Sequence, residues 1–128
     1  MDIILRQKLS LLINLAKADG HFAQEEKDLI TELALTKGLN KNEINDLIER
    51  PDSIESLGAL SRNRKKEYLI DSIKLMLADG RIEETERNFC RNISVKLRYH
   101  KDVVDFLINH WSSDIEGVDL SEFELADF

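Results

Sequence analysis

The stretch Ala18-Asp19-Gly20-His21-Phe22-Ala23-Gln24-Glu25-Glu26 returns later in the chain as Ala78-Asp79-Gly80-Arg81-Ile82-Glu83-Glu84-Thr85-Glu86. Both copies read Ala-Asp-Gly, one further residue, a large apolar residue, three more residues and then Glu. The copies stand sixty residues apart, Asp19 against Asp79, which predicts a chain built from two related halves.

Helical periodicity surrounds both copies. Residues 2–18 and 64–78, which precede them, carry apolar side chains around most of the helix circumference, a pattern typical of central helices. After each copy, a one-sided apolar stripe predicts an amphipathic helix. Each half is therefore expected to contain a helix, an Asp-Gly turn and a second helix.

A third helix is predicted in each half. Gly38 is a usual left-handed end for the preceding helix, and Asn40 followed by Glu43 resembles a capping box that opens the next one. Ser53 is expected to cap a short helix over residues 54–60. The third helix of the second half is expected to turn these residues inward: Val103, Val104, Leu107, Ile108 and Trp111.

These elements predict an all-α fold. The chain of 128 residues has one Pro and five Gly, and no segment alternates with a period of two, so no sheet is expected. We expect one single-domain bundle of about six to seven helices over residues 1–113, made of two pseudo-symmetric repeats at about 3–50 and 62–112.

Residues 114–128 form an acidic, apolar tail with six acids and no base. This composition fits a disordered tail, a tail docked on its own domain, or a segment that binds a partner. Docking or partial order is favoured.

The net charge of −7 argues against a nucleic-acid or anionic-membrane partner. The basic run at residues 62–66 is interpreted as the solvated start of a helix, with anion binding as the alternative. No signal peptide and no membrane-spanning run are recognised. A cytoplasmic location without membrane insertion is expected, and the single Cys90 permits no internal disulfide.

The acids of the repeated stretch are the candidate functional residues. Asp19 and Asp79 close helices, where the helix dipole disfavours a carboxylate, and Glu26 and Glu86 lie on the apolar side of the following helices. They are either structural, accepting backbone N–H groups in the first helical turn, or ligands of a hard cation such as Ca²⁺ or Mg²⁺.

An EF-hand calcium loop is a further interpretation of Asp-Gly followed by Glu. Such a loop needs oxygen donors two and four residues before the Asp. Those positions hold Leu15 and Lys17 in the first copy and Leu75 and Leu77 in the second. Because these residues continue a helix, no calcium loop is predicted.

Two helical halves, each with Ala-Asp-Gly and a Glu six residues after the Gly, resemble the TerB-like family, named for a tellurite-resistance protein. The resemblance implies an all-α, pseudo-symmetric bundle in bacterial proteins, a metal-binding or stress-sensing role, and no enzymatic activity. By that likeness the acidic positions are Asp19, Glu26, Asp79 and Glu86. Glu25 has only Thr85 opposite it, so the acidic pattern is not fully symmetric.

The histidines and the single cysteine do not predict a catalytic or metal site. His21, His100 and His110 are far apart in sequence, and Cys90 lies on an apolar stripe as a core thiol. No catalytic spacing or phosphate loop is present, so no enzyme is predicted.

The sequence thus predicts a non-catalytic TerB-like module in a bacterial stress or tellurite-resistance context. Its cofactor would be a divalent cation held by the four acids Asp19, Glu26, Asp79 and Glu86. We call the two segments that carry them, residues 18–26 and 78–86, the first and the second corner. The alternative is a protein-interaction adaptor whose acids are structural. A protein partner is expected, and the sequence does not identify it.

Overall fold

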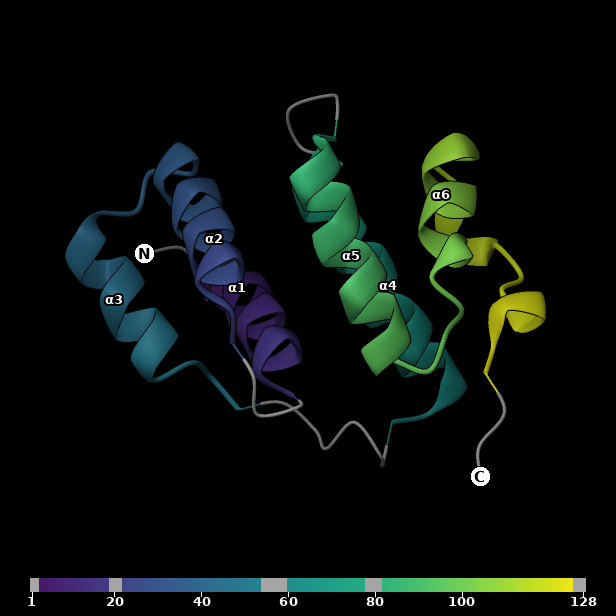
Figure 1. Cartoon of the computed structure of the whole chain (residues 1–128), viewed down its shortest axis with the longest axis horizontal. Helices are drawn as coiled ribbons and strands as arrows, with labels where there is room; N and C mark the ends of the chain where they lie inside the picture. The colour runs from purple at the N-terminus through teal and green to yellow at the C-terminus, as the bar shows by residue number, and fades with distance from the viewer. Residues whose placement is uncertain (1–2, 19–21, 54–59, 78–81, 126–128) are drawn as a thin grey trace. The chain divides into compact units, whose positions relative to one another are not determined.

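A computed structural model of the chain describes residues 3–18, 22–53, 60–77 and 82–125. Across these residues the chain forms six α-helices and two short 3-10 turns, with no β-strand (Figure 1). The all-α prediction is confirmed. The chain divides into two compact units, Met1–Ser56 and Leu57–Phe128. The single domain expected over residues 1–113 stays a prediction.

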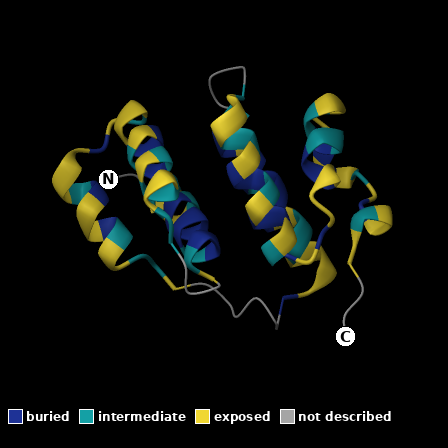
Figure 2. Cartoon of the chain, viewed as in Figure 1, coloured by how far each residue is buried: buried dark blue, intermediate teal, exposed yellow. Residues whose placement is uncertain are grey.

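Unit 1 is a three-helix packing of α1 (Ile3–Lys17), α2 (Gln24–Thr36) and α3 (Lys41–Glu49), in which each helix contacts the other two. The second half of α1 is buried around most of its circumference, as its broad apolar pattern predicts (Figure 2). The fully buried large side chains of this unit are Leu9, Leu12, Ile13, Leu15, Ile30, Ile44 and Leu47.

The turn from α2 to α3 follows local rules. Gly38 adopts φ +95°, the left-handed conformation that glycine reaches without a Cβ penalty. Asn40 Oδ1 accepts a hydrogen bond from Glu43 N at 2.8 Å, and Glu43 Oε1 accepts one from Asn40 N at 3.1 Å. Both the helix end and the capping box predicted here are confirmed.

The segment after α3 returns to α1. Asp52 pairs with Arg6 Nε at 3.1 Å, its backbone N–H donates to Ser10 Oγ at 3.0 Å, and its carbonyl accepts from Asn14 Nδ2 at 2.7 Å. One face of α1 therefore holds this segment by three polar contacts. The short helix expected at residues 54–60 falls almost wholly outside the described residues.

Unit 2 contains α4 (Arg62–Met76), α5 (Glu84–Lys96) and α6 (Asp102–Asn109), and α5 packs against both α4 and α6. Ser61 Oγ caps α4 by accepting from Arg64 N at 3.2 Å. The most deeply buried apolar side chains here are Leu69, Ile70, Ile73, Met76, Cys90, Ile93, Leu97, Val103, Val104 and Leu107.

The last α-helix is shorter than the sequence predicts. It ends at Asn109, so Trp111 lies beyond it and is only half-buried, and Ile108 is half-buried as well. The following Ser112, Ser113 and Asp114 favour turns over helix, because their short polar side chains bond the nearby backbone. Asp114 N donates to Ser112 Oγ at 3.3 Å in this way.

The tail is docked on unit 2. It forms the turns η3 (Ile115–Gly117) and η4 (Ser121–Phe123), and η3 packs against α4. Ile115 and Leu120 are buried. A one-rung antiparallel bridge between Tyr99 and Glu124 adds backbone hydrogen bonds. Docking, the favoured interpretation, is confirmed through residue 125.

Over the described ranges, no helix has both the length and the apolar character that crossing a membrane requires.

Candidate functional site

Both repeated glutamates cap the helices that they open. Glu26 Oε1 accepts a hydrogen bond from Ala23 N at 3.2 Å, and Glu86 Oε1 accepts one from Glu83 N at 2.9 Å. Each Glu is the third residue of its helix, where its carboxylate satisfies a backbone N–H that the helix leaves unpaired and faces the positive end of the dipole. This contact is the structural role considered from sequence.

The cap accounts for only one oxygen of Glu26. Its other oxygen, Oε2, is buried and makes no hydrogen bond, and it is the only such side-chain N or O among the residues that the structure describes. An unpaired buried polar atom costs about 1–3 kcal/mol, and more when the group is charged. Glu86 shows no orphaned oxygen of this kind. The two corners therefore differ, and the first holds an unused acceptor.

The other predicted ligands, Asp19 and Asp79, lie outside the described residues, as does His21. Within the described part of the chain, no three His, Cys, Asp or Glu side chains come together as metal ligands. Of the four predicted ligands the structure describes only Glu26 and Glu86, one in each unit, so the metal site stays a prediction. A cation site at either corner would need the Asp of that corner.

Cys90 is one helical turn beyond Glu86 and fully buried. Burial, with the nearby Glu86 carboxylate, raises the pKa of the thiol to about 12, although Arg87 opposes part of this shift. Such a thiol is not a nucleophile or a soft-metal ligand at neutral pH. The prediction of a core thiol is confirmed.

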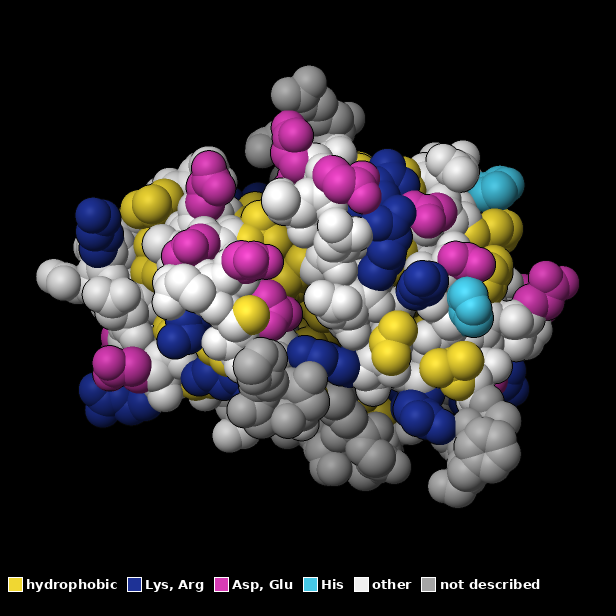
Figure 3. Space-filling view, viewed as in Figure 1, with side chains coloured by type: hydrophobic (Ala, Val, Ile, Leu, Met, Phe, Trp, Pro, Cys, Tyr) yellow, Lys and Arg dark blue, Asp and Glu magenta, His cyan; other side chains and the backbone are white. Residues whose placement is uncertain are grey.

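An ion-pair network joins α5 to α6 beside the second corner. Asp105 accepts from Arg87 Nη1 at 2.7 Å and from Arg91 Nη2 at 3.0 Å, and these hydrogen bonds lower the pKa of its carboxyl group despite partial desolvation. Arg91 also pairs with Glu84 at 3.1 Å. Figure 3 shows the resulting mixture of basic and acidic side chains over this face of unit 2. The network fixes helix packing and leaves no carboxylate cluster.

A basic row on α4 holds the tail. Arg62 pairs with Glu124 at 2.6 Å, and Lys74 Nζ pairs with Glu116 at 3.0 Å. Between them, Lys66 Nζ donates to the carbonyl of Val118 at 2.9 Å. Spacings of four and eight residues place all three bases on one side of the helix. We call Arg62, Lys66 and Lys74 the α4 basic row.

The solvated helix start expected at residues 62–66 is incomplete, because Arg62 and Lys66 contact the tail, as does Lys74 further along the helix. The sequence does contain a signal for this contact. Arg62, Lys66 and Lys74 recur at helical spacing, and the tail that they could pair with carries acids and no base. The offset of sixty also aligns Lys66 with Arg6 and Lys74 with Asn14, which hold Asp52 on α1 in unit 1. In both units, the segment that follows the third helix packs against this side of the first helix.

Two three-helix units, each with a helix-capping Glu after an Ala-Asp-Gly sequence, define an all-helical protein with a duplicated acidic corner. Residues 5–103 match the family described as Tellurite resistance protein TerB, and the chain belongs to the TerB family. TerB domains are in general not enzymes. No curated protein and no solved structure matches the chain.

Proposed function

We propose that this protein is a non-catalytic TerB module that binds a divalent cation at its acidic corners, in the bacterial cytoplasm and in a stress or tellurite-resistance context. The proposal treats the two halves as an internal repeat, with Asp19 and Glu26 as ligands in one corner and Asp79 and Glu86 in the other. Ca²⁺ and Mg²⁺ are the best matches, because all the ligands are carboxylate oxygens.

The observation that carries the proposal is Glu26 Oε2. A buried carboxylate oxygen without a donor is costly, and a hard cation offsets that cost by direct coordination. Oε1 continues to cap the helix at Ala23, so the cap and the ligand use different oxygens of one side chain. At Glu86 the cap is shorter and no oxygen is orphaned, so the first corner is the stronger candidate.

Substitution of Glu26→Gln is expected to weaken Ca²⁺ or Mg²⁺ binding at least about tenfold, equivalent to 1.4 kcal/mol. The amide removes the charge but keeps an oxygen that can cap Ala23 N, because Gln serves in capping boxes as Glu does. Isothermal titration calorimetry gives the affinity. Thermal unfolding with and without the cation gives an independent value, since a ligand of the folded state raises the Tm.

Two matched variants sharpen this experiment. Glu25→Gln removes the same charge from the exposed neighbouring residue and is expected to leave binding unchanged. Glu86→Gln tests the second corner separately. The cation proposal fails if wild-type protein gives neither heat nor a thermal shift with Ca²⁺, Mg²⁺, Mn²⁺ or Zn²⁺.

A second candidate function is a protein-interaction adaptor in which the acids are structural. The docked tail favours it. Glu116 and Glu124 of the tail form solvent-exposed ion pairs with α4, and neither residue belongs to a corner. Exposed pairs of this kind contribute little to stability, so their role in recognition is the stronger explanation.

The adaptor proposal predicts a protein prey from a bacterial extract whose retention changes when Glu116 and Glu124 are both replaced by Lys. Retention is expected to be unaffected by a chelator, because the surface does not use the cation. Quantitative pull-down with the full chain measures both effects. Retention that is indifferent to the two substitutions would count against this surface.

A further inference from the structure

We propose that the α4 basic row borders a groove for an acidic, apolar segment of a partner protein, and that residues 112–125 are an internal occupant that competes for it. The inference rests on the adaptor function proposed above and names the surface and the chemistry of the partner. It is independent of the cation proposal, because none of the corner residues that the structure describes lines this groove.

The resident segment shows what the groove recognises. Its acids meet bases at both ends, with Glu124 on Arg62 and Glu116 on Lys74. Two apolar anchors of the segment are buried, Ile115, just before Glu116, at 4% exposure and Leu120, between the two paired acids, at 3%. A matching partner segment therefore carries two large aliphatic residues about five positions apart, with acids flanking and between them.

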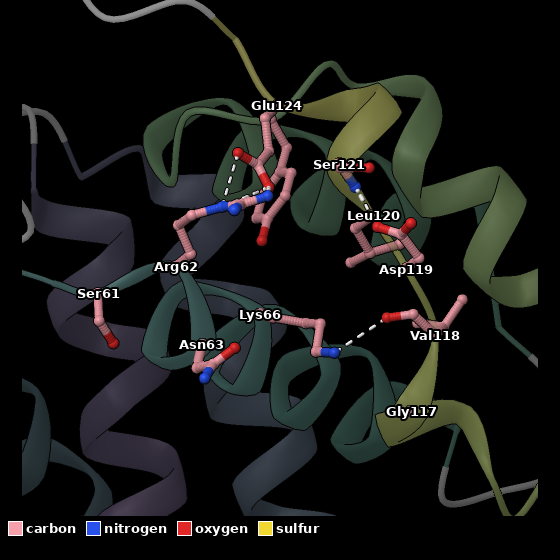
Figure 4. Close-up of a pocket in the computed structure, with 11 residues that line it drawn as sticks. Ser61, Arg62, Asn63, Lys66, Gly117, Val118, Asp119, Leu120, Ser121 and Glu124 are labelled. Carbon is pink, nitrogen blue, oxygen red and sulfur yellow. Dashed lines mark hydrogen bonds and ion pairs between the residues drawn. The ribbon is translucent and has the colours of Figure 1, made fainter.

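The occupant does not fill its site. A hollow of about 570 Å³ remains between the first turns of α4 and residues 117–121 (Figure 4). Arg62 reaches across one end of it to Glu124, and Lys66 crosses the other end to the Val118 carbonyl. The Asp119 carboxylate lies between them and accepts from Ser121 N at 3.0 Å. A longer or more regular segment has room that the resident one leaves open.

The segment is also held in a way that permits exchange. Its regular elements are two three-residue turns and the one-rung bridge at Glu124, and in the ion pair of Arg62 with Glu124 the two side chains are 73% and 34% exposed. Elements with few buried contacts and exposed hydrogen bonds open locally without global unfolding. The segment lies beyond residues 5–103, which match the TerB family. It is therefore a suitable internal competitor on a TerB scaffold.

The corresponding face of α1 supports the assignment. In unit 1 the chain after α3 is fixed there through Asp52 by Arg6, Ser10 and Asn14. In unit 2, Ser10 is replaced by Ile70 at the matching position, and Ile70 lines the groove beside Lys66. The position of the polar clamp residue Ser10 thus carries, in unit 2, a buried aliphatic side chain beside a base, which suits a segment with aliphatic anchors and acids.

A fluorescent synthetic peptide of residues 112–125, added to the full-length chain, tests the proposal by fluorescence anisotropy. The double variant Ile115→Ser and Leu120→Ser weakens the resident segment and leaves the groove intact. It is expected to bind the peptide at least about tenfold more tightly than wild type, because the competitor is removed. A peptide carrying the same two substitutions is expected not to bind.

A matched pair of charge reversals then locates the binding. In the double variant, Lys66→Glu is expected to weaken peptide binding at least about tenfold, while Lys41→Glu, an equal change of charge on exposed α3, leaves it unchanged. Binding that is equal in wild type and double variant, or indifferent to Lys66→Glu, overturns the groove. A prey captured by the adaptor experiment would survive that result, so the two failures are distinguishable.

Hydrogen exchange of wild-type protein decides the matter if the double variant does not fold. The Leu125 amide, which donates to the Arg98 carbonyl at 2.8 Å, is expected to exchange at least about tenfold faster than the Ile73 amide in the core of α4. Equal protection of the two amides would mean that the segment does not leave the groove, and the proposal would be wrong.

Discussion

Replacing Ile13 or Ile73 by Ala is expected to lower the free energy of unfolding by about 2–5 kcal/mol in each case. Both side chains are fully buried in the first helix of their unit, and they occupy matching positions sixty residues apart. Truncation removes three carbons from water-free packing and leaves a cavity that the surrounding helices fill only in part. Urea denaturation followed by circular dichroism measures the loss.

The same pair of variants tests the single-domain prediction. If the two halves unfold as one cooperative domain, each substitution shifts a single shared transition to lower urea. If the units unfold independently, wild type shows two transitions, and each variant shifts only one of them. Val95→Ala, at an exposed apolar position, is the control and is expected to cost no more than about 0.5 kcal/mol. A loss this small for Ile13→Ala or Ile73→Ala would contradict the packing described here.

The thiol of Cys90 is expected to react at least about a thousandfold more slowly in the native protein than in the unfolded chain. Its pKa rises from 9.0 to about 12, and below pH 9 each unit of pKa lowers the thiolate fraction about tenfold. Full burial adds to this protection by excluding the reagent. Reaction with an aromatic disulfide at pH 8, in buffer and in denaturant, gives the two rates.

Labelling of Cys90 should therefore report the opening of unit 2. Ile73→Ala is expected to accelerate it, because the destabilised core opens more often, whereas Val95→Ala on the exposed side of α5 is expected to leave it unchanged. A native rate within about tenfold of the unfolded rate would mean that Cys90 is accessible, and its assignment to the core would be wrong.

Much of the fold could be predicted because its signals are local. The capping box of Asn40 and Glu43 and the left-handed Gly38 depend on residues at most three positions apart, and both are present as expected. The broad apolar circumference of α1 likewise predicts a central helix, since periodicity alone identifies the faces that must leave water. The TerB resemblance, built on the duplicated Ala-Asp-Gly, is confirmed by the match over residues 5–103.

The end of the last helix was less predictable. Its apolar spacing continues to Trp111, but α6 ends at Asn109, because the following serines and Asp114 stabilise a turn. Period alone does not locate a helix end where capping and turn residues compete with it.

The candidate site was predicted only in part. Sequence spacing placed Glu26 and Glu86 in the first helical turn, and both make the backbone contacts that this position allows. Spacing gave no means to tell their oxygens apart, since the burial of Glu26 Oε2 depends on side chains brought around it by packing. Whether the acids of the two corners share a cation stays a prediction.

By itself, then, the sequence determined the helical class, the capping box at Asn40, the capping positions of Glu26 and Glu86, and the family. These features follow from hydrogen bonds and apolar periodicity within a few residues of each other. Only the tertiary structure decided that the tail docks on α4 and that one glutamate oxygen of the first corner is left without a partner. Arg62 and Glu124 are sixty-two residues apart, and contacts of that range form because helix packing brings their surfaces together, which no local pattern encodes.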